Sequence, residues 1–266
     1  MRSRDTDEEM PLLPHRNPGR PLPFLSRCRK HLMAEVSRDW ADIILILCYL
    51  ITGLLDSASI SVWGSFVSMQ TGNTVYLALG LSSPSASTRW IKSGASLFSF
   101  CIGSFLFSRF HRFFYPSRRW VLAASFAFQL LLTAVAASLV TASGTPADTE
   151  EISWRVLVPI ALVAFQSCGQ AVTSRALKYN ALTSVVLTSI YCDLFSDAQL
   201  FKLRNVERNR RAAAPFFLLL GAFFGGKFAS SGFGVAGALW TAAVLKAVAV
   251  FVWLIWPADK EGQEEG

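Results

Sequence analysis

The sequence predicts an all-α polytopic membrane protein with six to eight transmembrane segments, arranged in two related halves whose helices are interrupted by glycine and threonine. Three observations predict this fold class. The chain has long apolar runs and only 16% charged residues, whereas a typical soluble domain has about 25%. Two of these runs carry polar residues at their centres. The order of the runs in the first half is repeated in the second.

The chain divides into a tail, a membrane domain and a second short tail. Residues 1–39 are basic and rich in proline, which predicts a disordered cytosolic tail with a short amphipathic helix near residues 25–36. Residues 40–256 form the predicted membrane domain. Residues 257–266 are polar, and we expect this C-terminal tail to be cytosolic as well.

The membrane domain contains eight apolar runs. An α-helix rises 1.5 Å per residue, so about 20 apolar residues cross the roughly 30 Å of bilayer hydrocarbon. Most gaps between the runs carry basic residues, as expected where a helix leaves the membrane. The runs cover residues 40–59, 62–81, 93–107, 120–140, 154–177, 181–198, 212–229 and 235–256.

The number of crossings depends on the two polar runs, residues 62–81 and 181–198. If both enter the membrane and return on the same side, 20 basic residues face the cytoplasm and 3 face outside. If both cross fully, the totals are 17 and 6. An excess of Lys and Arg marks the cytoplasmic side, so six crossings fit better than eight. Six crossings place both termini in the cytosol.

The two halves, about residues 40–142 and 154–256, resemble each other in the order of their segments. Thr71 precedes Thr188 by 117 residues, and Gly103 precedes Gly221 by 118. Similar offsets are typical of an internal repeat, although apolar runs also resemble one another through shared composition. With three crossings in each half the repeats would be inverted, and with four they would be parallel.

The polar residues of the first half suggest a binding site. Gln70, Thr71, Gly72 and Asn73 interrupt one run, and Asp56 lies in the run before it. A carboxylate at membrane depth is costly and faces a protein interior or water-filled path. A helix break here would expose backbone groups to a solute or ion. The alternatives are close helix packing at the small residues and an interfacial position for Asp56.

Counterparts in the second half extend the candidate site. Gln170 corresponds approximately to Asp56, and Thr188 to the interrupted region. Lys246 lies near the middle of the last run and is a candidate partner for an acidic group, while Lys227 can reach the interface. The candidate substrate-binding residues are Asp56, Gln70, Thr71, Gly72, Asn73, Gln170, Arg175 and Thr188.

Several other classes of function are disfavoured. The five cysteines contain no CxxC pair and predict neither a disulfide framework nor a metal site. The three histidines lie in the tail or at the end of a run, and no nucleophile motif is present, so we expect neither an enzyme nor a cofactor. The net charge of +7 is explained by basic residues facing anionic lipid, so the expected partner is the bilayer and not nucleic acid.

These residues resemble a known family, the YoaK-like membrane proteins (domain of unknown function 1275). The resemblance rests on Gly53 and Asp56, on Phe66-Val67, and on the motif Thr71-Gly72-Asn73-Thr74. In the second half it continues through Gly169-Gln170-Ala171, Arg175, and Thr188 before Asp193-Leu194, where Ser189 replaces an expected glycine. It covers about residues 40–256 and implies a multi-spanning membrane protein that moves small molecules.

The sequence therefore predicts a transporter or channel for a small polar solute, with a polar site between two repeats. The alternative is a membrane scaffold or assembly factor that recruits partners through residues 1–39. Loss of function after removal of the tail, with no effect of substitutions at Asp56, would favour the scaffold.

Overall fold

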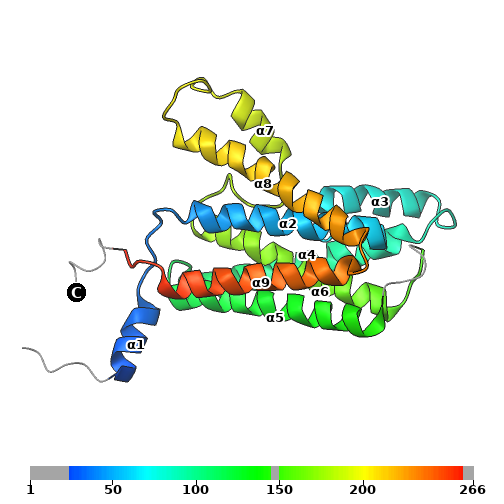
Figure 1. The fold of residues 1–266 in the computed structure, drawn as a ribbon, viewed down its shortest axis with the longest axis horizontal. Helices are drawn as coiled ribbons and strands as arrows, with labels where there is room; N and C mark the ends of the chain where they lie inside the picture. The colour runs from blue at the N-terminus through cyan, green and yellow to red at the C-terminus, as the bar shows by residue number, and fades with distance from the viewer. Residues whose placement is uncertain (1–23, 145–149, 260–266) are drawn as a thin grey trace, which may run out of the picture.

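The computed structural model describes residues 24–144 and 150–259, and in this part of the chain the fold is all-helical (Figure 1). Two isolated bridges supplement the helices. In chain order the helices are α1 (Phe24–Met33), α2 (Asp42–Trp63), α3 (Gln70–Ser82), α4 (Arg89–Phe114), α5 (Arg119–Ser143), α6 (Trp154–Ala176), α7 (Thr188–Phe195), α8 (Val206–Ala229) and α9 (Gly234–Ile255).

Six of these helices are long and apolar enough to cross a membrane, which confirms the predicted fold class. They are α2, α4, α5, α6, α8 and α9, and each has at least 22 residues. The two polar runs instead form α3, with 13 residues, and α7, with 8. Both are shorter than the about 20 residues that a crossing needs. The structure thus favours six crossings.

The segment between α2 and α3 turns back into the bundle. Helix α2 ends at Gly64, whose φ of 74° lies in the left-handed region that glycine adopts without strain. The following residues return along α2, so that Val67 lies beside Asp56 and is fully buried. Helix α3 then leads outward again. The tip of this first re-entrant segment is residues 64–69.

The segment between α6 and α7 makes a similar excursion from the opposite end of the bundle. Leu182 packs beside Leu45 and Tyr49 near the start of α2. Ser184 and Thr188 reach the level of Thr52, near the middle of that helix, where they line a common cleft. Helix α7 then runs outward, and in Figure 1 it lies with the N-terminal part of α8 apart from the other helices. The tip of this second re-entrant segment is residues 184–188.

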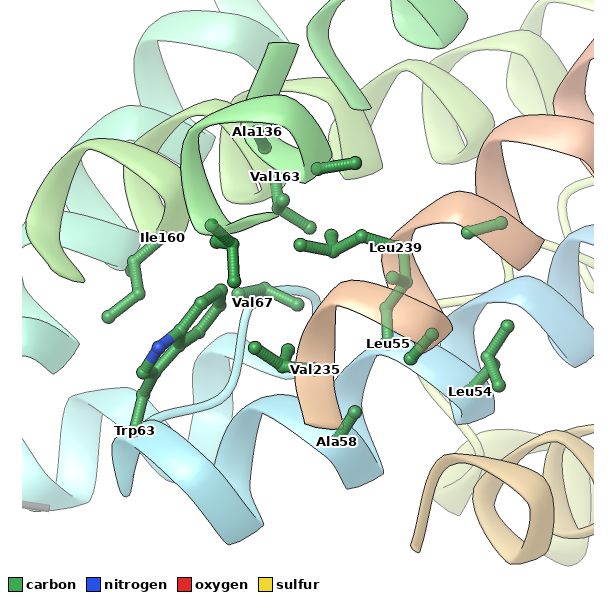
Figure 2. Packing of buried hydrophobic residues seen from close by; sticks show 14 of the residues in the cluster. Leu54, Leu55, Ala58, Trp63, Val67, Ala136, Ile160, Val163, Val235 and Leu239 are labelled. Atoms are coloured by element: carbon green, nitrogen blue, oxygen red, sulfur yellow. The ribbon is translucent and has the colours of Figure 1, made fainter. Parts of the chain in front are cut away.

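Two apolar clusters fill the bundle near its two ends. The first, called here the Trp63 cluster, joins α2, α5, α6 and α9 around Trp63, Ile160 and Leu239 (Figure 2). Val67 from the first re-entrant segment inserts into it. The second, the Trp253 cluster, joins the start of α2, the start of α5 and the end of α9. Because lipid tails are as apolar as these side chains, close van der Waals packing between the helices, more than hydrophobic burial, holds the bundle together.

Glycines allow the closest contacts between helices. A methyl group added at Gly53 of α2 would lie 2.0 Å from the carbonyl oxygen of Leu218 in α8. One added at Gly103 of α4 would lie 2.6 Å from the carbonyl oxygen of Phe165 in α6. The α2–α8 and α4–α6 pairs therefore pack backbone against backbone, as small residues permit in membrane proteins.

The terminal segments meet at one end of the bundle. Glu35 and Val36 form bridges with Arg118 and Ala258, and the Arg119 guanidinium donates to the carbonyl oxygens of His31 and Trp256. Helix α1 overlaps the stretch near residues 25–36 where a short amphipathic helix was expected. The chain is helical from residue 24, and Glu35 and Val36 pack against the bundle. Residues 1–23 and 260–266 of the predicted tails lie outside the described residues.

We expect acidic pH to loosen the start of α4, because Glu150 acts as its cap from outside the membrane. The Glu150 carboxylate accepts hydrogen bonds from the backbone N–H and hydroxyl of Thr88 and from the Ser87 hydroxyl. These bonds favour the ionised form and lower its pKa below the usual glutamate value. Because the pKa of Glu150 is lower in the folded than in the unfolded protein, its ionised form stabilises the fold at pH values above the unfolded-state pKa. This stabilisation is lost as the pH falls through the folded-state pKa.

Hydrogen exchange of the first turn of α4 checks this expectation. Protection relative to the intrinsic rate should fall on acidification in the wild type. In Glu150→Gln, protection at neutral pH should be lower than in the wild type, and it should change little on acidification. An equal loss of protection on acidification in both proteins would contradict the role of Glu150.

Candidate functional site

Asp56 holds the first re-entrant segment in place. Its side chain is buried within α2, and its Oδ1 accepts hydrogen bonds from the backbone N–H groups of Val67 at 2.9 Å and Ser68 at 2.8 Å. Backbone donors away from water must be paired. The carboxylate thus satisfies two donors that the non-helical tip would otherwise leave unpaired.

Asn73 binds the same segment from the α3 side. This fully buried amide donates to the Phe66 carbonyl oxygen at 2.8 Å and accepts from the Phe66 N–H at 3.1 Å. It also donates to the Ser96 hydroxyl of α4 at 3.0 Å, and that hydroxyl donates to the Phe66 carbonyl oxygen. Asn73 therefore pairs both backbone polar groups of one residue, Phe66, and ties the loop to α4.

Further side chains complete this network. Gln70 donates from its amide to the Val67 carbonyl oxygen at 3.2 Å. Ser59 of α2 donates to the Ser65 carbonyl oxygen at 2.7 Å, and Ser167 of α6 donates to the Val67 carbonyl oxygen at 3.1 Å. Side chains from α2, α3, α4 and α6 thus hold the first re-entrant tip.

A cleft of about 560 Å³ lies between the two re-entrant tips. One wall contains Asp56 with the first turn of α3, and the other contains the backbone around Ser184. Leu218 and Ala222 of α8 close part of it. The lining is mostly apolar, and its polar residues are Thr52, Asp56, Ser57, Thr71, Ser184 and Thr188.

The cleft brings together four of the eight predicted site residues: Asp56, Thr71, Gly72 and Thr188. The others lie elsewhere. Gln70 and Asn73 point toward α4 and bind the loop. Gln170 is buried in α6, and Arg175 is exposed at the end of that helix, so neither lines the cleft.

One expectation about charge partners is corrected. Among the described residues, Lys246 does not pair with an acidic group; its ammonium donates to Oε1 of Gln129 at 2.8 Å. The hydrogen-bond partners of Asp56 are backbone N–H groups.

Sequence reasoning missed several residues of the site. Ser96 lies in an apolar run with no special spacing, and only the fold shows that it binds the loop. Thr52 precedes Asp56 by four residues and therefore shares its helix face, a signal that was available in the sequence.

The fold and the buried polar network define a polytopic α-helical membrane protein with two re-entrant segments. Residues 44–252 match the family described as Protein of unknown function (DUF1275), so the chain belongs to this family. The resemblance seen in the Asp56 and Thr71-Gly72-Asn73 motifs is thereby confirmed. No curated protein and no solved structure matches the chain.

Proposed function

We propose that the protein is a transporter or channel for a small polar solute and that the cleft between the re-entrant tips binds this solute. The observation that carries the proposal is the cleft itself, about 560 Å³ in volume and lined from both halves of the chain. Non-helical backbone at membrane depth is typical of protein that surrounds a cavity or path. In transporters such sites lie near the midplane, between broken helices.

The charges around the cleft favour a neutral solute with hydrogen-bonding groups. Among the described residues that line the cleft, Asp56 is the only ionisable one. Helices α3 and α7 both begin at the cleft, and neither has a side-chain cap. Each helix N-terminus carries roughly +0.5 charge, so the two together offset one carboxylate. A solute with both donors and acceptors suits this balance.

Two buried hydroxyl groups lie in the walls of the cleft. Thr52 and Ser184 are no more than 2% exposed, and their side-chain oxygens have no hydrogen-bond partner among the described residues. Both residues line the cleft. Hydroxyl groups donate and accept, so they complement sugar-like, amide or polyol groups better than a bare ion.

The packing of the helices supports the proposed internal repeat. Suppose that α2, α3, α4 and α5 of the first half correspond to α6, α7, α8 and α9 of the second. The counterpart of the α2–α8 pair is then the α6–α4 pair. Both pairs are in contact, and a glycine makes each approach possible, Gly221 in one and Gly103 in the other. Three crossings per half give an inverted repeat, and such repeats rock against each other in many transporters.

The distribution of basic residues gives the proposed orientation. The end of the bundle that holds both terminal segments also holds Arg118 and Arg119. Most basic residues outside the membrane lie on this side under the six-crossing topology. We therefore place this end, with both termini, in the cytosol.

Flux through liposomes tests the proposal. Purified protein in liposomes should speed the entry of at least one neutral solute from a panel of urea, glycerol, small sugars and simple carboxamides. Thr71→Trp and Thr188→Trp, which fill the cleft from positions open to it, should return the rate to near that of protein-free liposomes. The matched control is Leu131→Trp, at a position 57% exposed on α5, which should keep the wild-type rate.

Two outcomes would contradict the proposal. One is wild-type liposomes that are no faster than protein-free ones for every solute. The other is a cleft-filled variant that transports like Leu131→Trp. A scaffold would give the first outcome.

A further inference from the structure

A layer of buried polar side chains lies between the Trp63 cluster and the Trp253 cluster. On α5 it separates Ala136 of the first cluster from Phe126 of the second, and on α9 it separates Ala242 from Ala249. None of its members is more than 1% exposed. They are Gln129 and Thr133 of α5, Gln166 and Gln170 of α6, and Lys246 of α9.

Lys246 has no acidic partner in this layer. Its ammonium donates to Gln129 Oε1 at 2.8 Å and lies 5.7 Å from the ring centre of Phe126. Helices α4, α5, α6 and α9 contain no Asp or Glu. The two carboxylates of α2 are engaged elsewhere, Asp56 with the re-entrant segment and Asp42 with Arg210. Within residues 24–144 and 150–259, the positive charge at the centre of the bundle thus lacks a counter-charge.

Gln166 and Gln170 lack partners altogether in the part of the chain that the structure describes. For both residues, the amide nitrogen and oxygen are buried without a hydrogen bond. Gln170 follows Val163 by two helical turns and so continues the face that packs into the Trp63 cluster. Fully unpaired carboxamides are rare in protein interiors and call for water or a ligand.

Gln129 contacts both Lys246 and the helix that carries the unpaired amides of Gln166 and Gln170. Its Oε1 accepts from Lys246, and its Nε2 lies 2.6 Å from where a methyl group at Gly169 would be. The end of its side chain therefore lies against α6 at the position next to Gln170. This contact places Lys246 and the unpaired amides at the same depth in the bundle.

We propose that Lys246, Gln166 and Gln170 bind a small inorganic anion of the halide class at the centre of the membrane domain. An ammonium has three donors, and only one is used by Gln129. The two carboxamides add further N–H donors. A halide accepts such bonds without needing a donor in return, and it supplies the missing negative charge. This site is separate from the cleft and does not depend on the solute proposed for it.

Anion titration of the purified full chain in detergent tests the site. Gluconate is replaced stepwise by chloride, bromide or nitrate at constant ionic strength, and the melting temperature is followed. A ligand that binds only the folded state raises the melting temperature in a saturable way. We expect saturation in the wild type and in Lys227→Met, the matched removal of a lysine that also lies 5.7 Å from a phenylalanine ring. We expect no anion response in Lys246→Met.

Gln170→Leu keeps the test decisive if Lys246→Met does not fold. Without an anion this variant should be at least as stable as the wild type, because leucine removes unpaired buried polar atoms. It should raise the half-saturating anion concentration about tenfold through loss of one hydrogen bond to a charge. The proposal is overturned if the wild type shows no saturable response, or if folded Lys246→Met or Gln170→Leu responds like the wild type.

Discussion

Replacing Gly221 with alanine is expected to disrupt the contact between α2 and α8 and to lower the yield of folded protein sharply. The added methyl group would lie 2.0 Å from the carbonyl oxygen of Leu50 and 2.9 Å from the backbone nitrogen of Leu54. Backbone atoms cannot rotate away as a side chain can, so the helices must separate. Overpacking costs about 1–3 kcal/mol even where side chains adjust. The yield of monodisperse protein and its melting temperature in detergent measure the effect.

Gly232→Ala is the matched control, because a methyl group at this position meets no atom within 4 Å. It should behave like the wild type. If Gly221→Ala and Gly232→Ala had the same yield and melting temperature, the close approach of the two helices would be contradicted.

Replacing Asp56 with alanine is expected to release the first re-entrant segment. The change leaves the N–H groups of Val67 and Ser68 without an acceptor in a buried position. Each unpaired buried donor costs about 1–3 kcal/mol, a large part of the stability of an ordinary domain. Hydrogen exchange of residues 64–69 should become much faster, and the melting temperature should fall.

Asp56→Asn removes the negative charge but keeps a side-chain oxygen that can accept hydrogen bonds, so it separates the two effects. Its amide oxygen can still accept from both N–H groups, so exchange at residues 64–69 should stay close to the wild-type rate. Fast exchange in Asp56→Asn, equal to that in Asp56→Ala, would show that the ionised carboxylate and not an acceptor oxygen holds the loop. Slow exchange in Asp56→Ala would contradict the anchoring role itself.

The sequence predicted the parts of the fold that depend on local composition. Apolar runs located all six long helices. The first break lies at residues 64–69, just before Gln70–Asn73, where it was expected; those four residues form the first turn of α3 instead. The same polar residues were interpreted as ligands for a solute or as a site of close helix packing. Their bonds to the loop depend on how residues 64–69 return beside α2, which no local pattern specifies.

Contacts between distant segments escaped prediction for the same reason. The position of Gln170 was inferred from a repeat offset, which gives a helix position but not the direction of its side chain. Lys246 was expected to meet an acid, yet its partner is an amide 117 residues earlier in the chain. The packing of residues 35–36 against residues 118 and 258 likewise joins segments that have no common pattern.

The two walls of the cleft differ in how firmly they are fixed. Residues 64–69 are held by side chains from four helices, α2, α3, α4 and α6, whereas the hydroxyl of Ser184 in the facing wall has no partner within the described chain. We therefore expect residues 64–69, beside α3, to stay in place when the cleft opens or closes. We expect the segment that leads into α7 to move instead, so a mobility probe there should respond to gating while one at Val67 should not.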